Sequence, residues 1–130
     1  MKEDPPSEGP PTLPPSAEAV RTESGLEYFD VVPGNGATAK AESRVRVSYR
    51  GWLTDGTLFE STERGGGSLE FLVAGDEVIP ALDEGVRGMR VGGKRRLIAP
   101  SDLAYGPRGK KGSVPPFATL IFDVELLGVR

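Results

Sequence analysis

The fold is most constrained by a stretch near the C-terminus, Val114-Pro115-Pro116-Phe117-Ala118-Thr119-Leu120-Ile121-Phe122-Asp123-Val124-Glu125-Leu126-Leu127. Leu120, Phe122, Val124 and Leu126 alternate with Thr119, Asp123 and Glu125, while Ile121 breaks the pattern. This alternation predicts a strand with one face on a core, where Phe122 points inward. The two prolines cannot donate hydrogen bonds to a neighbouring strand, so they must precede it. We therefore expect the loop that begins at Ala104-Tyr105-Gly106 to lie over the region that the sheet covers.

The composition is that of one soluble globular domain. The chain has 130 residues, of which 37% are hydrophobic and 27% charged. Its net charge of -3 argues against a nucleic-acid partner, which would require a positive field. Two basic clusters, Lys94-Arg95-Arg96 and Arg108-Gly109-Lys110-Lys111, are interpreted as a solvated strand face and a loop tip. No apolar run approaches the roughly 20 residues of a membrane span.

Two missing residue types narrow the chemistry, because the sequence contains neither His nor Cys. A Ser-His or Cys-His nucleophile, an imidazole or thiolate metal site and a disulfide are all excluded. A carboxylate metal site stays possible in principle, but Asp76-Glu77 is followed at once by apolar residues, unlike a calcium-binding loop. We therefore expect neither a metal nor a cofactor.

The first 21 residues carry six prolines and few apolar side chains, so we expect residues 1–21 to be a disordered tail and residues 22–130 to be the folded domain. The charged start Met1-Lys2-Glu3-Asp4 does not fit a signal peptide. Two locations stay open: the cytoplasm by default, or an exported, periplasmic form whose signal was removed.

The remaining chain predicts an α+β roll: four to six short antiparallel strands wrapped on one short helix. Strands are expected at residues 24–32, 44–53, 58–60, 69–73, 94–100 and 120–126. In the second strand, alternation places Tyr49 toward the core, beside Phe59, and Trp52 on the opposite face. The helix should be capped by Asp76, carry Pro80 in its first turn, and end at Gly88 or at residues 92–93.

Residues 45–127 closely resemble the FKBP family, the tacrolimus-binding peptidyl-prolyl cis-trans isomerases. The resemblance is carried, in order, by Tyr49-Arg50-Gly51, Asp55-Gly56 with Phe59, Glu77-Val78-Ile79, Glu84-Gly85-Val86 with Met89, Ala104-Tyr105-Gly106 and Pro115 to Leu126. It implies a bent antiparallel sheet around a single helix, with the active pocket between them. Three positions depart from the usual pattern: Glu60 replaces an aspartate, Leu82 a tryptophan, and Leu69 an aromatic residue.

The resemblance also implies the site residues. Its catalytic group would comprise Tyr49, Phe59, Glu60, Ile79, Tyr105 and Phe122, and its substrate-binding walls Leu69, Phe71, Val78, Leu82 and Val114. In this assignment the backbone N–H of Ile79 and the hydroxyl of Tyr105 donate hydrogen bonds to substrate carbonyls. Glu60 either orients Tyr49 or accepts a hydrogen bond from a substrate N–H.

The expected function is that of a monomeric isomerase acting on proline-containing polypeptides, with macrolides of the tacrolimus or rapamycin type as further ligands. Rotation about an X-Pro bond breaks no covalent bond, so an apolar pocket with one or two hydrogen bonds suffices for catalysis. An aromatic cluster in a small domain is also typical of an ordinary core. The alternative function is therefore a proline-peptide binding module with weak or no catalysis. The resemblance implies a further distinction, because members of the family with strong chaperone activity carry an inserted domain in the loop after the Ala-Tyr-Gly motif. The loop after Tyr105 is too short to hold one, which favours the isomerase.

Overall fold

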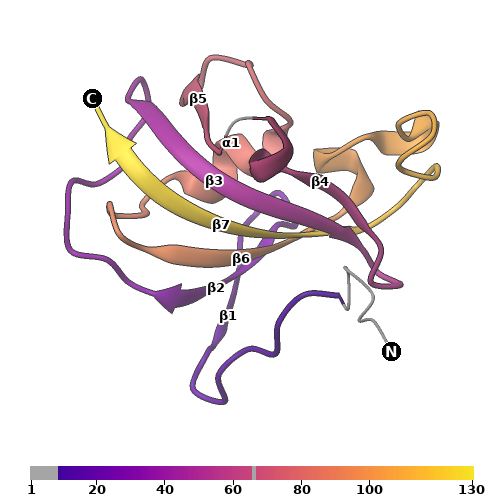
Figure 1. Cartoon of the computed structure of the whole chain (residues 1–130), viewed down its shortest axis with the longest axis horizontal. Coiled ribbons are helices and arrows are strands. Elements are labelled where there is room, and N and C mark those ends of the chain that lie inside the picture. The colour runs from indigo at the N-terminus through magenta and orange to yellow at the C-terminus, as the bar shows by residue number, and fades with distance from the viewer. Residues whose placement is uncertain (1–8, 66) are drawn as a thin grey trace.

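The structure is a computed structural model that describes residues 9–65 and 67–130, and its main element is one antiparallel sheet (Figure 1). The strands are β1 (Ala19–Arg21), β2 (Glu27–Val32), β3 (Arg44–Leu53), β4 (Leu58–Ser61), β5 (Leu69–Leu72), β6 (Lys94–Ala99) and β7 (Leu120–Val129). Their order is β1-β2-β6-β7-β3-β4, and β5 also pairs with β3. The predicted α+β class is confirmed, although the described residues form seven strands and not four to six.

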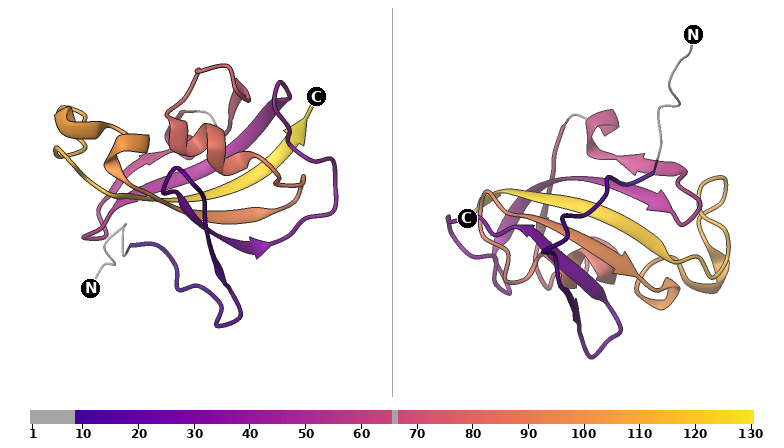
Figure 2. Two further views of the ribbon diagram at one scale, coloured as in Figure 1. Left: turned by 180° about the vertical axis from the view of Figure 1, so that it is seen from behind. Right: turned by 90° about the horizontal axis from the view of Figure 1, so that it is seen from below.

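The two long central strands follow the alternation seen in the sequence. In β3, Val45, Val47 and Tyr49 are buried, whereas Arg46 and Arg50 are exposed. Strand β7 pairs with β3 over most of its length, and its inward residues are also buried. One face of this curved sheet thus carries the core, and α1 (Pro80–Val86) lies against it (Figure 2).

The helix is short and lies very close to the sheet. Gly85 makes this approach possible, because a Cβ at that position would overlap Leu97 Cδ1 and lie 2.8 Å from Leu97 Cδ2. The buried residues Leu82 and Val86 continue the same contact. The close approach of Gly85 to Leu97 therefore holds α1 directly against β6.

The predicted N-cap of the helix is wrong. Asp76 has a φ of 59°, which belongs to a turn, and Ile79 is the extended residue that precedes the first turn. Pro80 occupies the first helical position, as predicted, and Gly88 follows the last turn with a φ of 86°. Of the two predicted ends, the one at Gly88 is correct. The residues before Pro80 thus form a turn and are not part of the helix.

The predicted boundary of the tail differs from the structure. Residues 1–8 lie outside the described part of the chain, but Ala19–Arg21 form β1 and pair with β2. An edge strand is held by backbone hydrogen bonds, which need no apolar side chains, so the composition of the tail gave no sign of it. No helix in the described residues is long and apolar enough to cross a membrane.

Candidate functional site

A pocket of about 380 Å³ lies where β3, β4 and the start of α1 meet the loop after β6. Its lining residues are Tyr49, Glu60, Asp76, Glu77, Val78, Ile79, Leu82 and Tyr105. Six of these eight were predicted from the sequence: Tyr49, Glu60, Val78, Ile79, Leu82 and Tyr105. The pocket therefore combines apolar walls with two tyrosine hydroxyls and carboxylates.

The base of the pocket is a cluster of four aromatic rings in edge-to-face contact. The Phe122 ring lies 5.9 Å from the rings of both Tyr49 and Phe59, and Phe59 lies 6.4 Å from Tyr105, measured between ring centroids. Phe122 thus joins Tyr49 to Phe59, which were predicted to lie directly side by side. The register of β3 with β4 is the reason: Arg50 lies opposite Ser61 and Gly51 opposite Glu60, so Phe59 lies further along the ladder than Tyr49.

Glycine at position 51 is required by this cluster. A Cβ on Gly51 would lie 2.8 Å from Phe122 Cε1 and 2.9 Å from two carbons of the Phe59 ring. Real Cβ atoms do not approach other atoms so closely. The two rings can therefore pack over β3 only because this residue has no side chain.

Burial and the nearby carboxylate of Glu60 shift the pKa values of both pocket tyrosines. Burial first, and then the charge of Glu60 and a hydrogen bond to it, raise the pKa of the Tyr49 hydroxyl above its usual value of 10.0. Burial and the charge of Glu60 also raise the pKa of Tyr105. Both hydroxyls accordingly keep their protons at neutral pH and can act as hydrogen-bond donors.

The backbone of Ile79 supplies a further donor. Its carbonyl accepts hydrogen bonds from the N–H groups of Leu82 and Asp83, at 3.1 and 3.2 Å, which start the helix. Its own N–H has no acceptor among the described residues. Since Ile79 lines the pocket, this N–H is available to the carbonyl of a bound molecule.

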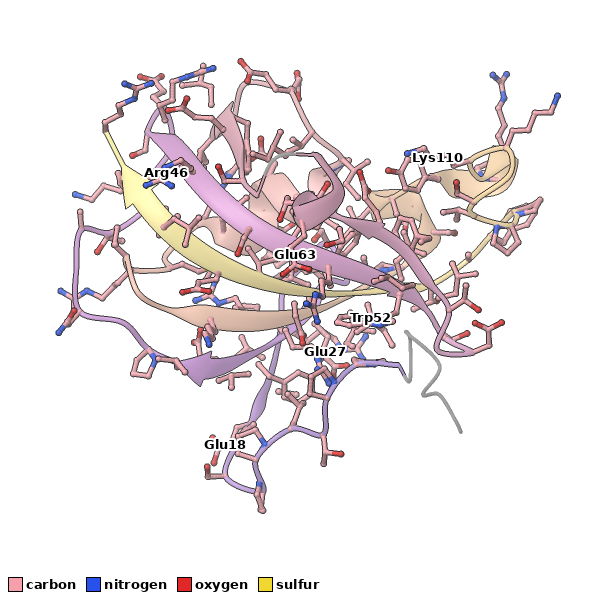
Figure 3. All side chains as sticks on the ribbon, in the orientation of Figure 1. Glu18, Glu27, Arg46, Trp52, Glu63 and Lys110 are labelled. Carbon is pink, nitrogen blue, oxygen red and sulfur yellow. The ribbon has the colours of Figure 1, made fainter. Side chains whose placement is uncertain are left out.

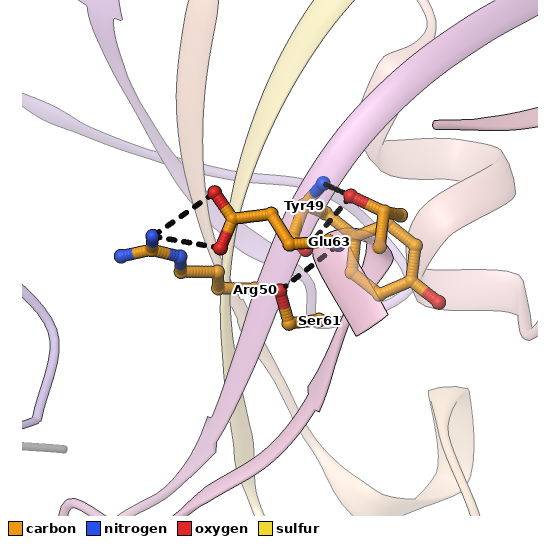
Figure 4. Close-up of polar contacts among 5 residues, drawn as sticks. Tyr49, Arg50, Ser61 and Glu63 are labelled. Carbon is orange, nitrogen blue, oxygen red and sulfur yellow. Dashed lines mark hydrogen bonds and ion pairs between the residues drawn. The ribbon is translucent and has the colours of Figure 1, made fainter. Parts of the chain in front are cut away.

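Backbone and side-chain contacts hold Tyr49 in place from the outside of β3 (Figure 4). The Tyr49 N–H donates to Thr62 Oγ1 at 3.0 Å, and the Thr62 hydroxyl donates to the Tyr49 carbonyl at 3.4 Å. Beside them, Arg50 forms an ion pair with Glu63 at 2.9 Å, and the Glu63 N–H donates to Ser61 Oγ at 3.2 Å. The turn after β4 therefore fixes the strand position from which the Tyr49 ring enters the pocket.

Several predicted site residues are not part of the pocket lining. Phe71 is 1% exposed and Phe122 is fully buried, so neither ring reaches the open space directly. Val114 is also buried, where its backbone closes the loop with Lys110. Leu69 and Phe59 are partly buried and pack on the core. The alternation of apolar and polar residues predicted which side of each strand faces the core. It could not predict which positions along the strand border the pocket.

The sequence interpretation missed Asp76 and Glu77 as lining residues. Glu77 Oε1 accepts a hydrogen bond from the Leu72 N–H at 3.2 Å, and Oε2 lies 3.7 Å from Arg44 Nη1. The two residues directly precede Val78 and Ile79 in the sequence, which was the available signal. Among the described residues, no group of three or more carboxylates could hold a metal ion.

Comparisons with known proteins agree with this geometry. The family profile described as FKBP-type peptidyl-prolyl cis-trans isomerase matches residues 35–127. FK506-binding protein 4 of Dictyostelium discoideum is 49% identical over 113 residues, covering 87% of this chain and 30% of that protein. The FKBP-type 22 kDa peptidyl-prolyl cis-trans isomerase of Escherichia coli is 48% identical over 108 residues, covering 83% of this chain and 52% of that protein.

A solved structure gives the same result for the fold. The crystal structure of AtFKBP13 matches with a TM-score of 0.79 and 37% identity, over 87% of this chain and 99% of that one. The chain thus spans about a third to a half of the length of the two sequence relatives, but nearly the whole of this structural relative.

Proposed function

This chain belongs to the family of FKBP-type peptidyl-prolyl cis-trans isomerases, and from this premise we propose that its pocket accelerates rotation about X-Pro bonds in polypeptides. The observation that carries the proposal is a pocket with apolar walls and two available hydrogen-bond donors, the Tyr105 hydroxyl and the Ile79 N–H, beside a Tyr49 hydroxyl that Glu60 holds. Such a site can hold a proline ring and the carbonyls beside it.

The physics of the reaction suits a pocket of this kind. An X-Pro amide must cross a barrier of about 18–20 kcal/mol, because rotation destroys amide resonance. The planar amide is more charge-separated than the twisted transition state, so an apolar enclosure destabilises the ground state relative to the transition state. Each ~1.4 kcal/mol of this difference is worth about tenfold in rate.

Each group in the pocket has a distinct role in this proposal. The Ile79 N–H and the Tyr105 hydroxyl donate to substrate carbonyls, and Val78, Ile79 and Leu82 form the apolar walls. Glu60 accepts a hydrogen bond from the Tyr49 hydroxyl and so holds the Tyr49 side chain in place. Phe59 and Phe122 are positioning residues, because they set the angles of the tyrosine rings by edge contacts.

The proposed substrates are proline-containing polypeptides, and we propose that the domain binds them as a monomer. Macrolides of the tacrolimus type are proposed as further ligands, which the name of the Dictyostelium relative supports. Leu82 in the pocket wall offers apolar contact without an aromatic face. A competition assay between a macrolide and a proline peptide measures this affinity directly.

Tyr105→Phe tests the proposed catalytic contact with little disturbance of the fold. The ring contact with Phe59 is kept, while one hydrogen bond worth about 0.5–1.5 kcal/mol is lost. We expect kcat/KM to fall a few-fold to about tenfold in a protease-coupled proline-peptide isomerisation assay.

Tyr28→Phe is the matched control for this change. Tyr28 lies on β2, away from the pocket lining, and its ring stacks under the Arg95 guanidinium at 4.1 Å, a contact that phenylalanine retains. We expect its activity to match the wild type. If neither Tyr105→Phe nor Glu60→Gln changes a measurable rate, the assignment of the pocket fails. If the wild type has no rate above background, the chain is a proline-peptide binding module.

The isomerase rate should be nearly constant between about pH 6 and 8, because the sequence contains no His or Cys to titrate there. The pKa of Tyr49 is higher in the folded chain than the usual 10.0, so the folded state holds this proton more tightly than the unfolded state. The protonated Tyr49 hydroxyl therefore contributes fully to the free energy of unfolding below about pH 10. This contribution is lost as the pH rises through the higher pKa of the folded state. Rates and urea unfolding across a pH series check both statements, and a bell-shaped profile near neutrality would contradict the first.

A further inference from the structure

The N-terminal segment, residues 9–17, crosses the outer face of the sheet, on the side away from α1 (Figure 2). Trp52 lies on this outer face, near the segment (Figure 3). It is only 3% exposed, although Arg50 on the same side of β3 is exposed. A tryptophan on the polar side of a strand is thus covered from outside the core.

The segment roofs a groove without filling it. The groove has a volume of about 420 Å³ and is lined by Pro11 to Pro14 on one side and by Trp52, Val31 and polar outer-face residues on the other. The buried residues Tyr49 and Val124 also border it, and Tyr49 borders the pocket as well. Protein interiors pack nearly without voids larger than a water molecule. A groove of this size under the segment shows that the segment leaves space against the sheet that it does not fill.

No hydrogen bond joins residues 9–13 to the groove wall within the described chain. Residues 9–13 make no backbone hydrogen bond within the described chain, and the nearest one joins the Ala17 N–H to the Pro14 carbonyl at 3.0 Å. Most of the charges on the groove wall are paired, Arg50 with Glu63, Arg96 with Asp123 and Arg95 with Asp30, whereas Lys94 and Glu125 form no ion pair within the described residues. What the segment offers to Trp52 is a Pro-x-x-Pro spacing, Pro11-Thr12-Leu13-Pro14, of the kind that aromatic grooves bind.

We propose that this groove is a second binding site for proline-rich polypeptide segments, separate from the pocket. Residues 9–17 cover it in the chain itself, and a segment of Pro-x-x-Pro spacing from another polypeptide takes their place. The two sites lie on opposite faces of the sheet. A proline-rich substrate held at the outer face would stay at high local concentration near the pocket. The inference does not depend on the isomerase activity.

The first experiment loosens the segment in the full chain with the triple variant Pro11→Ser, Leu13→Ser and Pro14→Ser. Trp52 is the only tryptophan, so its emission reports the groove alone. The emission should shift to longer wavelength and be quenched more strongly by acrylamide, while the isomerase rate and the far-UV circular dichroism match the wild type. The single variant Leu13→Ser should show a smaller shift of the same kind. An unchanged emission would overturn the proposal.

The second experiment adds the occupant back as a labelled synthetic peptide of residues 9–17. It should bind the triple variant, reverse the shift of Trp52 emission, and bind the wild type several-fold more weakly, because the wild-type segment competes. A peptide with its four prolines replaced by alanine is the matched control and should bind at least about tenfold more weakly. Adding Trp52→Leu to the triple variant should abolish binding, whereas adding Tyr105→Phe should not. Equal binding of both peptides, or a loss of binding only with Tyr105→Phe, would refute the second site.

Discussion

Phe122→Ala is expected to lower the free energy of unfolding by about 3–5 kcal/mol and to remove most of the isomerase activity. The side chain is fully buried, and its ring centroid lies 5.9 Å from the ring centroids of both Tyr49 and Phe59. Its removal leaves a cavity directly behind the pocket, into which both neighbouring rings can turn. The Tyr49 ring, which lines the pocket, is then no longer held at a fixed angle. The variant therefore loses the shape of the pocket as well as stability.

Loss of stability alone also lowers activity, so this prediction needs a variant that separates the two effects. Phe71→Ala provides it, because Phe71 is 1% exposed, of the same size, and makes none of the ring contacts described for the pocket. Urea unfolding followed by Trp52 emission should give similar losses of stability for the two variants. Isomerase rates should be compared at low temperature, where both are folded.

Under these conditions we expect Phe122→Ala to be at least about tenfold slower than Phe71→Ala, which corresponds to ~1.4 kcal/mol in the barrier. Phe122→Leu is the milder change if the alanine variant does not fold. Equal rates for the Phe122 and Phe71 variants would mean that the ring cluster stabilises the domain without positioning the pocket.

The comparison of these two phenylalanines shows how far the sequence could predict the site. Alternation placed Phe71 and Phe122 on inward faces, and both are buried. It could not show that Phe71, paired with Val45, lies away from the pocket, whereas Phe122 lies next to Gly51 between the pocket rings. Depth along a strand is decided by the register with its neighbours, which is a property of the whole sheet.

The errors at the N-terminus have a different physical cause. Composition identifies segments that cannot bury an apolar core, and on this ground residues 1–21 were expected to be disordered. Ala19–Arg21 are ordered by backbone pairing, and two of the prolines before them line a groove together with Trp52, a proximity that no periodic pattern records. The available signal was Trp52 itself, a large aromatic residue among arginines on the polar side of its strand.

Gly51→Ala is expected to be nearly as damaging to activity as Phe122→Ala, although it adds only one methyl group. The new Cβ would lie 2.8 Å from the Phe122 ring and 2.9 Å from the Phe59 ring, so at least one ring must move, and the space open to it is the pocket. Overpacking of this kind costs about 1–3 kcal/mol of stability. The isomerase rate should fall by about tenfold or more, since the displaced ring occupies the place of the proline.

Gly128→Ala is the matched control, because it is also a strand glycine without a positive φ, and its Cβ would meet only the Arg46 guanidinium at 3.8 Å. Its stability should stay within about 0.5 kcal/mol of the wild type, with unchanged activity. Urea unfolding and the isomerisation assay on both variants give the comparison. A Gly51→Ala chain as stable and as active as Gly128→Ala would show that the rings are free to rearrange, and rigid edge contacts would then no longer account for the shape of the pocket.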